Sequence, residues 1–282
     1  MKLGLVLEGG ASRTVFSCGI MDSLLKYNIL ADYVIGASAG ISYGVSYCAE
    51  QIGRNRRIIA EYMDDTRYMG IRHFFDKNNK CYYNLEFVYK TIPGGLVPFD
   101  FDKYRDFKGN IIAAVTRLDT GEAEHLELPR DDSAFLGLQA SCALPLLFKP
   151  IKIGNYYYMD GGIVDSIPFE KALADGCDKI IVILTRERGY IKKREAAIGL
   201  ISACYRRYPK FVAAVKRRHD KYNSDIKKLF KYEREGRAFV ICPPDTHGIK
   251  RTERKPGILL QFHDEGYIYA ESVMDKIKSF LE

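Results

Sequence analysis

A serine between glycines, Gly36-Ala37-Ser38-Ala39-Gly40, follows the short apolar run Tyr33-Val34-Ile35 and precedes a segment with helical spacing. A serine hydroxyl is a weak nucleophile, so an enzyme that uses one must expose it, orient it and supply a base. A sharp turn from a strand into a helix does the first two, and the positive end of the helix dipole adds to the effect. The alternative is a plain turn of small residues, so the motif by itself makes Ser38 only a candidate nucleophile.

A second turn of small residues, Gly9-Gly10-Ala11, lies between the apolar run Lys2 to Leu7 and a helical pattern that starts near Arg13. Acyl transfer builds negative charge on a carbonyl oxygen, and rigid backbone N–H groups near that oxygen stabilise the charge. A glycine-rich turn at the start of a helix is suited to presenting such donors. A phosphate-binding loop is the alternative, but the turn lacks G-x-G-x-x-G spacing and a G-K-[ST] triplet, which disfavours nucleotide binding.

An acidic turn, Asp160-Gly161-Gly162, follows the tyrosine-rich run Tyr156 to Met159. An Asp-Gly pair is most often a simple turn. A functional carboxylate at this point would lie at the edge of an apolar sheet, where partial desolvation would raise its pKa and make it a better base. The two glycines would let the loop approach the turn that carries Ser38.

Taken together and in this order, the three motifs resemble those of the patatin-like phospholipase family, in its bacterial form. The stretch Ala140-Ser141-Cys142-Ala143-Leu144-Pro145 is similar to the family's A-S-x-A-x-P segment, and the resemblance covers about residues 1–185. It implies a three-layer α/β/α sandwich with a mainly parallel sheet, and a catalytic dyad in which Ser38 attacks and Asp160 takes its proton. It also implies oxyanion donors at Gly9, Gly10 and Ala11, and supporting roles for Arg13, Gly36, Gly40, Gly161 and Gly162.

Two positions of the first turn depart from the family pattern. Ala11 stands where the family usually has a third glycine, and Thr14 stands where a further glycine usually follows the basic residue. A threonine that must adopt a positive φ is strained, so Thr14 bears on how well the donors are placed. For Arg13 we weigh two roles, steadying the loop and meeting an anionic head group, against a solvated surface position.

The elements around these motifs alternate between strand and helix. Residues 2–7 and 33–35 have the apolar character of buried parallel strands, and residues 13–28 and 41–52 have helical spacing. The same patterns predict further strands at 110–116, 123–128, 151–153, 156–159, 179–184 and 238–241. Helices are expected at 168–175, 192–236 and 262–281, and residues 133–147 begin helical and break at Pro145. Such alternation predicts a parallel sheet covered by helices.

Two segments lie outside this regular core. Residues 54–108 are irregular and rich in aromatic and charged side chains, and we expect a lid or cap there. Residues 186–282 form a basic, mainly helical C-terminal part that packs on the core of residues 1–185. Between residues 186 and 237 the chain carries 17 Lys/Arg against 6 Asp/Glu, whereas the other residues carry 26 against 30. The excess suits docking on anionic lipid or on nucleic acid, and a solvated helix face is the simpler alternative.

Composition narrows the remaining possibilities. The 282 residues are 47% hydrophobic and 28% charged, as in ordinary globular proteins. Seven cysteines occur without a C-x-x-C pair or a Cys/His cluster of zinc-ligand spacing, so we expect free thiols, no metal and no cofactor. No run of about 18 apolar residues is present, and the first apolar run is too short for a signal peptide. We therefore expect a cytoplasmic protein that reaches its lipid substrate from outside the bilayer, with peripheral membrane contact through residues 186–237 and no nucleic acid.

Two other functions stay open at this stage. A catalytically weak protein that binds lipid or nucleic acid would have the same fold, and Ala11 and Thr14 favour it. An esterase of the α/β-hydrolase kind would use a Ser-Asp-His triad, with His247 or His263 as its histidine. Against the triad, only one predicted strand precedes the strand that leads to Ser38.

Overall fold

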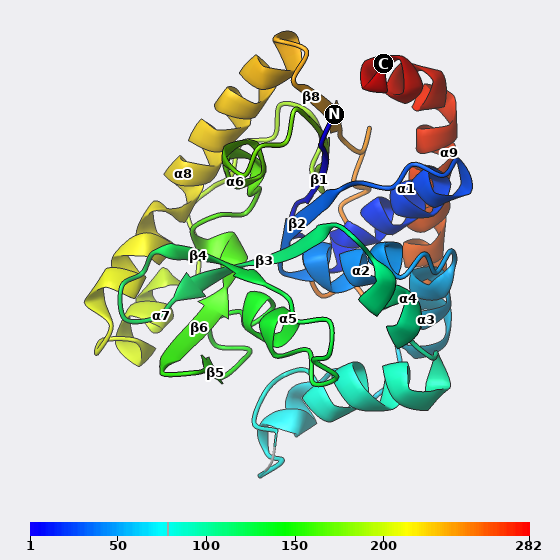
Figure 1. Ribbon diagram of the computed structural model, residues 1–282. Coiled ribbons are helices and arrows are strands. Elements are labelled where there is room, and N and C mark those ends of the chain that lie inside the picture. Colours follow the sequence, from blue (N-terminus) through cyan, green and yellow to red (C-terminus); the bar gives the residue numbers. More distant parts are fainter. Residues whose placement is uncertain (78) are drawn as a thin grey trace.

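The computed structural model describes residues 1–77 and 79–282. Within these residues eight strands form one sheet in the order β5-β6-β3-β2-β1-β7-β8, with β4 paired to β3 beside this path (Figure 1). The strands are β1 (Leu3–Leu7), β2 (Tyr33–Ala37), β3 (Asn110–Arg117), β4 (Ala123–Glu127), β5 (Ile151–Ile153), β6 (Tyr156–Asp160), β7 (Lys179–Ile183) and β8 (Ala238–Ile241). The pairs that join β3, β2, β1, β7 and β8 are parallel, whereas β4, β5 and β6 join through antiparallel pairs.

Strand β1 lies at the centre of the parallel part. Leu5 is opposite Val34 of β2 on one side and Ile181 of β7 on the other, and all five residues of β1 are buried. A strand that is apolar along its whole length suits a sheet whose two faces are both covered. The run Lys2 to Leu7 therefore becomes an interior strand, as its composition predicts.

Helices cover both faces of the sheet. On one face Leu5 and Leu7 pack with α1 (Val15–Lys26), α2 (Ala39–Cys48) and α9 (Pro256–Leu281). On the opposite face Val6 packs in a second core with residues of α6 (Phe169–Ala174) and α8 (Pro209–Arg234). The smaller helical segments are η1 (Ala11–Thr14), α3 (Arg54–Tyr62), η2 (Ile71–Phe74), η3 (Phe87–Leu96), α4 (Phe101–Asp106), α5 (Leu136–Ser141), η4 (Gly161–Ile163) and α7 (Ile198–Cys204). The predicted three-layer α/β/α architecture with a mainly parallel sheet and a helical C-terminal region is confirmed.

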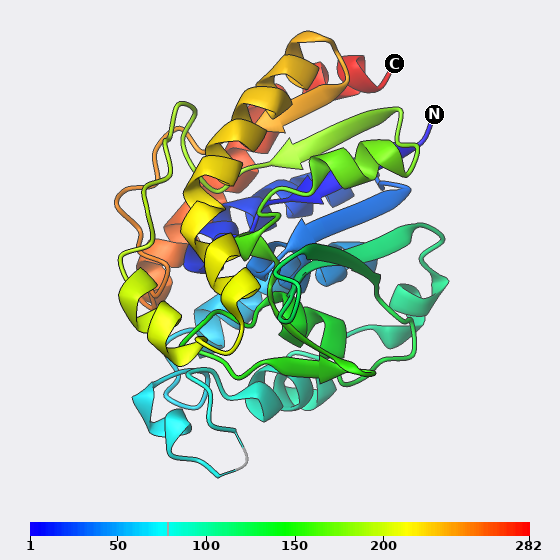
Figure 2. The same ribbon diagram turned by 90° about the vertical axis from the view of Figure 1, so that its left-hand side faces the viewer.

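The C-terminal residues belong to the same layers of the fold. Strand β8 extends the parallel sheet beyond β7, and α9 packs lengthwise against α1, where the Phe16 and Phe262 rings lie 5.3 Å apart (Figure 1). Helix α8 crosses the opposite face of the sheet (Figure 2). Residues 186–282 thus contribute a strand to the sheet and helices to both of its faces.

Several element boundaries differ from the sequence expectations. The basic segment 192–236 is not one helix, because α7 ends at Cys204 and α8 starts at Pro209, a residue type that favours the first turn of a helix. The last helix starts at Pro256 rather than at residue 262, for the same reason. The helix after Ser38 ends at Cys48 instead of residue 52.

Residues 54–108 contain α3, η2, η3 and α4. The part around η2, coloured cyan, projects away from the sheet (Figure 2). Met69 and Tyr83 form an antiparallel bridge that closes this projection at its base. The segment η3 is a π-helix that contains Pro93.

In residues 1–77 and 79–282 no helix is both long and apolar enough to cross a bilayer. Over the same residues no three His, Cys, Asp or Glu side chains are grouped so that they could hold a metal ion.

Candidate active site

Ser38 occupies a strained turn between β2 and α2. Its φ of 53° and ψ of −133° belong to neither element, and a residue with a side chain adopts them only when its surroundings enforce them. The backbone N–H of Ser38 donates to Ser141 Oγ at 2.8 Å, and that hydroxyl donates to Ala114 O at 2.7 Å. These two bonds tie the turn to β3, the next strand of the sheet.

The topology brings Asp160 to this turn from 122 positions along the chain. Strand β2 pairs with β3, where Ala37 is opposite Ala114, and β3 pairs with β6, where Val115 is opposite Asp160. As a result Ser38 Oγ donates a hydrogen bond of 2.7 Å to Asp160 Oδ2.

Hydrogen bonds hold both the side chain and the backbone carbonyl of Asp160. Its side chain is almost fully buried, its Oδ1 accepts from the N–H of Gly162 at 2.7 Å, and its backbone carbonyl accepts from Thr116 Oγ1 at 2.8 Å. Burial raises the pKa of Asp160 above its ordinary value, while the hydrogen bond from Ser38 and the charge of Arg218 act in the opposite direction. A carboxylate with a raised pKa is a stronger proton acceptor than an exposed one.

Close backbone contacts explain the glycines of both motifs. A Cβ added to Gly40 would lie 2.6 Å from Leu7 O, and one added to Gly161 would lie 2.0 Å from Ala114 O. A side chain at Gly40 would push α2 away from β1, and one at Gly161 would push η4 away from β3. A Cβ added to Gly36 would lie 2.9 Å from Ile41 N, and one added to Gly162 would lie 2.9 Å from Asp160 Oδ1.

The first glycine turn lies beside Ser38. The N–H of Gly9 donates to Ser166 O at 3.3 Å, whereas those of Gly10 and Ala11 have no hydrogen-bond partner in the described part of the chain. Ala11 has a φ of 50°, the conformation that glycine usually provides. Thr14 has a φ of −65°, so the strain that we considered at Thr14 is absent and falls on Ala11 instead.

Arg13 is a buried residue, so a solvated surface position is wrong for it. Its Nη1 donates to Ile249 O at 3.5 Å, which ties the first helix to the loop before α9, and its Nε has no partner among the described residues. Burial, together with the charges of Arg186 and Arg251, lowers the pKa of Arg13 to about 10.

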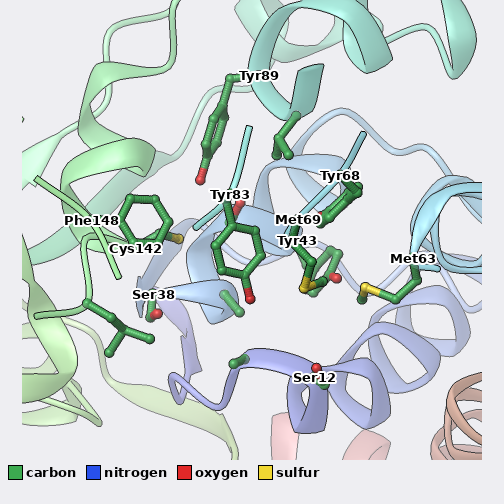
Figure 3. Close-up of a pocket in the computed structure, with 15 residues that line it drawn as sticks. Ser12, Ser38, Tyr43, Met63, Tyr68, Met69, Tyr83, Tyr89, Cys142 and Phe148 are labelled. Carbon is green, nitrogen blue, oxygen red and sulfur yellow. The ribbon is translucent and has the colours of Figure 1, made fainter. Parts of the chain in front are cut away.

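An apolar pocket with an empty volume of about 630 Å³ opens at Ser38 (Figure 3). Its walls come from α2, from residues 63–89 and from the segment before β5. The lining residues include Ser38, Tyr43, Met63, Tyr68, Met69, Tyr83, Val88, Tyr89, Cys142, Leu144 and Phe148. A pocket with such an apolar lining suits a hydrocarbon chain.

Cys142 is the thiol of this pocket, and burial raises its pKa to about 12. It is therefore a neutral thiol at physiological pH and has little nucleophilic character. Its side chain is half-buried and forms part of the pocket wall.

The two histidines considered for a triad have other partners. His263 contacts Asp22 and Asp264 at 3.1 and 3.0 Å, and His247 contacts Glu265 at 2.8 Å. Neither lines the pockets that contain Ser38 within the described residues. The carboxylate that meets Ser38 does so directly, with no imidazole between them.

Sequence reasoning missed three side chains that shape the site. Arg218 Nε donates to Gly162 O at 2.6 Å and Arg251 lines the site, yet their sequence signal was only positive charge. Ser141 was visible in the A-S-x-A-x-P segment, but its hydrogen bond to Ser38 depends on the placement of α5 beside β3.

Comparison with known proteins places the chain in a family. The sequence profile of the patatin-like phospholipases matches residues 5–173, which is more than half of the chain. The chain belongs to the patatin-like phospholipase family. Membership supports a lipid acyl hydrolase activity in general terms. A domain of unknown function, DUF6363, matches residues 208–282 of this patatin-like protein.

Three curated relatives share about a quarter of their aligned residues with this patatin-like chain. The uncharacterized protein YjjU of Escherichia coli is 25% identical, over 65% of this chain and 52% of its own length. Lysophospholipase NTE1 of Candida albicans is 25% identical, over 64% of this chain and 13% of its own, and the probable lipid hydrolase 463L of invertebrate iridescent virus 6 is 26% identical, over 60% and 62%. The chain thus spans less than two thirds of each of these relatives.

Among solved structures, VipD from Legionella pneumophila has a similar fold. The TM-score is 0.54 at 15% sequence identity, and the match covers 98% of this chain and 67% of VipD. At this identity the likeness concerns the fold alone.

Proposed function

We propose that this protein hydrolyses acyl esters of lipids, in the manner of a phospholipase A or lysophospholipase, with Ser38 as nucleophile and Asp160 as general base. The observation that carries the proposal is the 2.7 Å hydrogen bond from the hydroxyl of Ser38 to a buried carboxylate at the mouth of an apolar pocket. A nucleophile that lines a pocket, an adjacent base and space for the acyl chain are the components that ester hydrolysis requires.

The proposed reaction has two halves. Ser38 Oγ bonds to the ester carbonyl carbon as Asp160 takes the hydroxyl proton, and collapse of the tetrahedral intermediate breaks the bond to the alcohol oxygen, which receives that proton from Asp160. A water molecule then attacks the acyl-serine and gives its proton to Asp160, and the proton returns to Ser38 as the fatty acid leaves. The sum is an ester and water converted to an acid and an alcohol.

The negative oxygen of each intermediate needs donors. Gly10 and Ala11 have N–H groups that are free of hydrogen bonds in the described residues, and both residues line the space beside Ser38. We assign the oxyanion site mainly to these two groups. Gly9 takes a supporting position, because its N–H already donates to Ser166 O.

Residues 54–108 supply the cap in this proposal. Met63, Tyr68, Met69, Tyr83 and Tyr89 all come from this segment and form much of the acyl pocket. For membrane contact, the exposed basic side chains of residues 186–237, such as Arg206 and Lys210, suit an anionic bilayer surface.

The decisive experiment replaces each member of the dyad. Ser38→Ala and Asp160→Asn should lower kcat for a short-chain nitrophenyl ester and for lysophospholipids by at least about a thousandfold, because each removes one half of the nucleophile and base unit. A fluorophosphonate should label the unmodified protein at Ser38 and leave Ser38→Ala unlabelled. Ser224→Ala and Asp275→Asn, on the exposed surfaces of α8 and α9, are the matched controls. Undiminished hydrolysis in both dyad variants would remove the proposal.

A further inference from the structure

A second pocket, with an empty volume of about 470 Å³, opens on the other side of Ser38. Of the residues that line the apolar pocket, it shares Ala11, Ser38 and Leu144. An ester bound at Ser38 with its acyl chain in the apolar pocket therefore directs its alcohol portion toward this second space. The character of the second pocket bears on which alcohol fits.

Positive charge dominates this second pocket. Its lining includes five cationic side chains, Arg13, Arg186, Lys192, Arg218 and Arg251, and two acidic ones, Glu8 and Asp160. Three of the five, Arg186, Lys192 and Arg218, belong to the basic segment 186–237. Part of the charge excess that the sequence suggested for an outer surface thus faces the site.

The acidic groups nearby are already engaged. Glu8 Oε2 accepts from the N–H of Thr185 at 2.6 Å, and Asp160 is bonded to Ser38 and Gly162. Glu195, just outside the lining, contacts Arg218 and Arg251 at 3.3 and 3.6 Å. Arg13, Arg186 and Lys192 have no carboxylate partner in the part of the chain that the structure describes.

Several contacts fix the backbone segments that carry these cations, and one fixes a guanidinium group directly. Asn223 of α8 donates to the backbone carbonyl of Lys192 at 3.0 Å and accepts from its N–H at 2.8 Å. Ser12 Oγ donates to Arg251 O at 2.8 Å, and Arg218 Nε donates to Gly162 O at 2.6 Å. The segments that carry the cluster are therefore held in place before any ligand arrives, which lowers the cost of binding.

The positive charges of these neighbouring side chains repel one another. Burial first, and then the charges of neighbouring arginines, lower the pKa of Lys192 and of Arg218. Arg13 adds a buried Nε that has no acceptor among the described residues. A multivalent anion would supply the missing acceptor and offset the repulsion, and planar guanidinium groups match phosphate oxygens well.

On top of the proposed function, we propose that this cationic pocket binds a phosphate on the alcohol side of the ester, so that the preferred substrates are acyl esters of phosphorylated alcohols whose phosphate has no cationic substituent. The chemistry recognised is that of a phosphomonoester dianion, such as that of an acylated glycerol phosphate.

The side chains around the pocket disfavour a zwitterionic head group. A quaternary ammonium group is recognised by carboxylates or by open aromatic faces. The carboxylates are engaged, and the nearby rings already face cations, with Arg186 4.4 Å from the centroid of Tyr190 and Lys192 3.9 Å from that of Tyr222. A choline or ethanolamine substituent would meet arginine and lysine instead of a partner.

The test compares three substrates with the same acyl chain, each kept below its critical micelle concentration: lysophosphatidate, lysophosphatidylcholine and monoacylglycerol. The unmodified protein should have a kcat/KM for lysophosphatidate at least about tenfold above that for either of the others, because several charged hydrogen bonds form only with the dianion. Lys192→Met and Arg251→Gln should each reduce the ratio of lysophosphatidate to monoacylglycerol by about fivefold or more, mainly through KM.

Matched controls make the same changes of charge away from the pocket. Lys227→Met and Arg217→Gln alter exposed side chains of α8 and should leave the ratio unchanged. Equal kcat/KM values for the three substrates, or a ratio that Lys192→Met and Arg251→Gln leave intact, would overturn the inference. An equal fall in all four variants would do the same, because it would indicate a general surface effect.

Two further measurements separate possible failures. Inorganic phosphate should inhibit lysophosphatidate hydrolysis competitively; if phosphate only raises the melting temperature while no substrate preference exists, the pocket binds free phosphate and the inference is wrong. If monoacylglycerol is hydrolysed through Ser38 without a preference for phosphate, the inference fails and the proposed function stands. If no ester is cleaved and no fluorophosphonate label appears at Ser38, the proposed function fails first.

Discussion

The hydroxyl of Ser141 accepts the backbone N–H of Ser38 at 2.8 Å and so holds the candidate nucleophile in a conformation that neither a strand nor a helix would give it. Ser141→Ala should lower the free energy of unfolding by about 1–3 kcal/mol, because it leaves the N–H of Ser38 and the carbonyl of Ala114 unpaired in a buried place. The variant should lower kcat by a larger factor than it raises KM, because the turn relaxes while the proposed acyl pocket is unchanged.

Urea unfolding and steady-state kinetics on the same preparations check this prediction. Ser202→Ala is a suitable control, because that hydroxyl donates to a carbonyl one turn earlier in α7. An unfolding free energy for Ser141→Ala that equals that of Ser202→Ala would contradict the role assigned to Ser141.

The pH dependence of hydrolysis should reflect the environment of Asp160. As the proposed general base, Asp160 acts in its ionised form, and burial raises its pKa above the ordinary 3.8. The acid limb of kcat/KM for a neutral ester should therefore lie at a pH above 3.8, with activity lost as the pH falls through the raised pKa. Arg218→Gln removes a positive charge that lowers this pKa, so it should move the limb to still higher pH.

A pH–rate profile of the unmodified protein and of Arg218→Gln tests this expectation. Arg217→Gln, an exposed neighbour on α8, provides the control and should leave the limb in place. A limb that Arg218→Gln shifts to lower pH would contradict the electrostatic argument.

Much of the framework follows directly from the sequence, and the reason is local. The apolar runs that became β1, β2 and β7 and the turns at Ser38 and Asp160 each depend on neighbouring residues, so pattern and turn chemistry suffice to locate them. The boundaries near Pro209 and Pro256 were harder, because proline reads as a breaker in a sequence but is accepted in the first turn of a helix.

The cationic pocket could not be predicted in the same way. Arg13, Arg218 and Arg251 come from three distant parts of the chain, and only the packing of α8 and the loop before α9 around the first turn brings them together. In the sequence each contributes only a charge, and a charge indicates nothing about the direction in which its side chain points.

Replacing Asp160 with asparagine should make the protein inactive but more stable at neutral pH. Asparagine can still accept from the N–H of Gly162 and meet Ser38, while the cost of burying a charge is removed. Because the folded pKa of Asp160 is raised, that cost is fully present above the folded pKa and disappears as the pH falls toward 3.8. The gain in melting temperature should therefore be largest at neutral pH and shrink in acid.

Thermal unfolding of both proteins between acid and neutral pH measures this difference. Asp275→Asn, an exposed change of the same kind, should show no such trend. A gain in stability that grew as the pH fell would be opposite in sign and would contradict a raised pKa.

Thiol modification should spare the site. Cys204 is exposed, whereas Cys142 has a pKa raised to about 12 by burial, so iodoacetamide at neutral pH should alkylate Cys204 first. One equivalent of label should leave hydrolysis unchanged, and Cys204→Ser should remove the fast phase of labelling. Peptide mapping by mass spectrometry identifies the position, and rapid inactivation with label at Cys142 would show that its thiol is more accessible and more acidic than its burial indicates.

Ala11 has the backbone conformation of the glycine that its relatives' pattern usually has at this position, with a φ of 50°. A left-handed conformation costs a residue with a side chain about 1 kcal/mol, so Ala11→Gly should raise the free energy of unfolding by up to about that amount. Ala213→Gly, inside α8, is the matched control and should lower the free energy of unfolding by about 1 kcal/mol, because a helix interior favours alanine.

Since glycine preserves the turn, Ala11→Gly should hydrolyse esters within about twofold of the unmodified rate. Ala11→Val should lose both stability and activity, because a β-branched side chain resists a positive φ. A drop in stability for Ala11→Gly similar to that of Ala213→Gly would mean that Ala11 is not strained and that this departure from the family pattern has no cost.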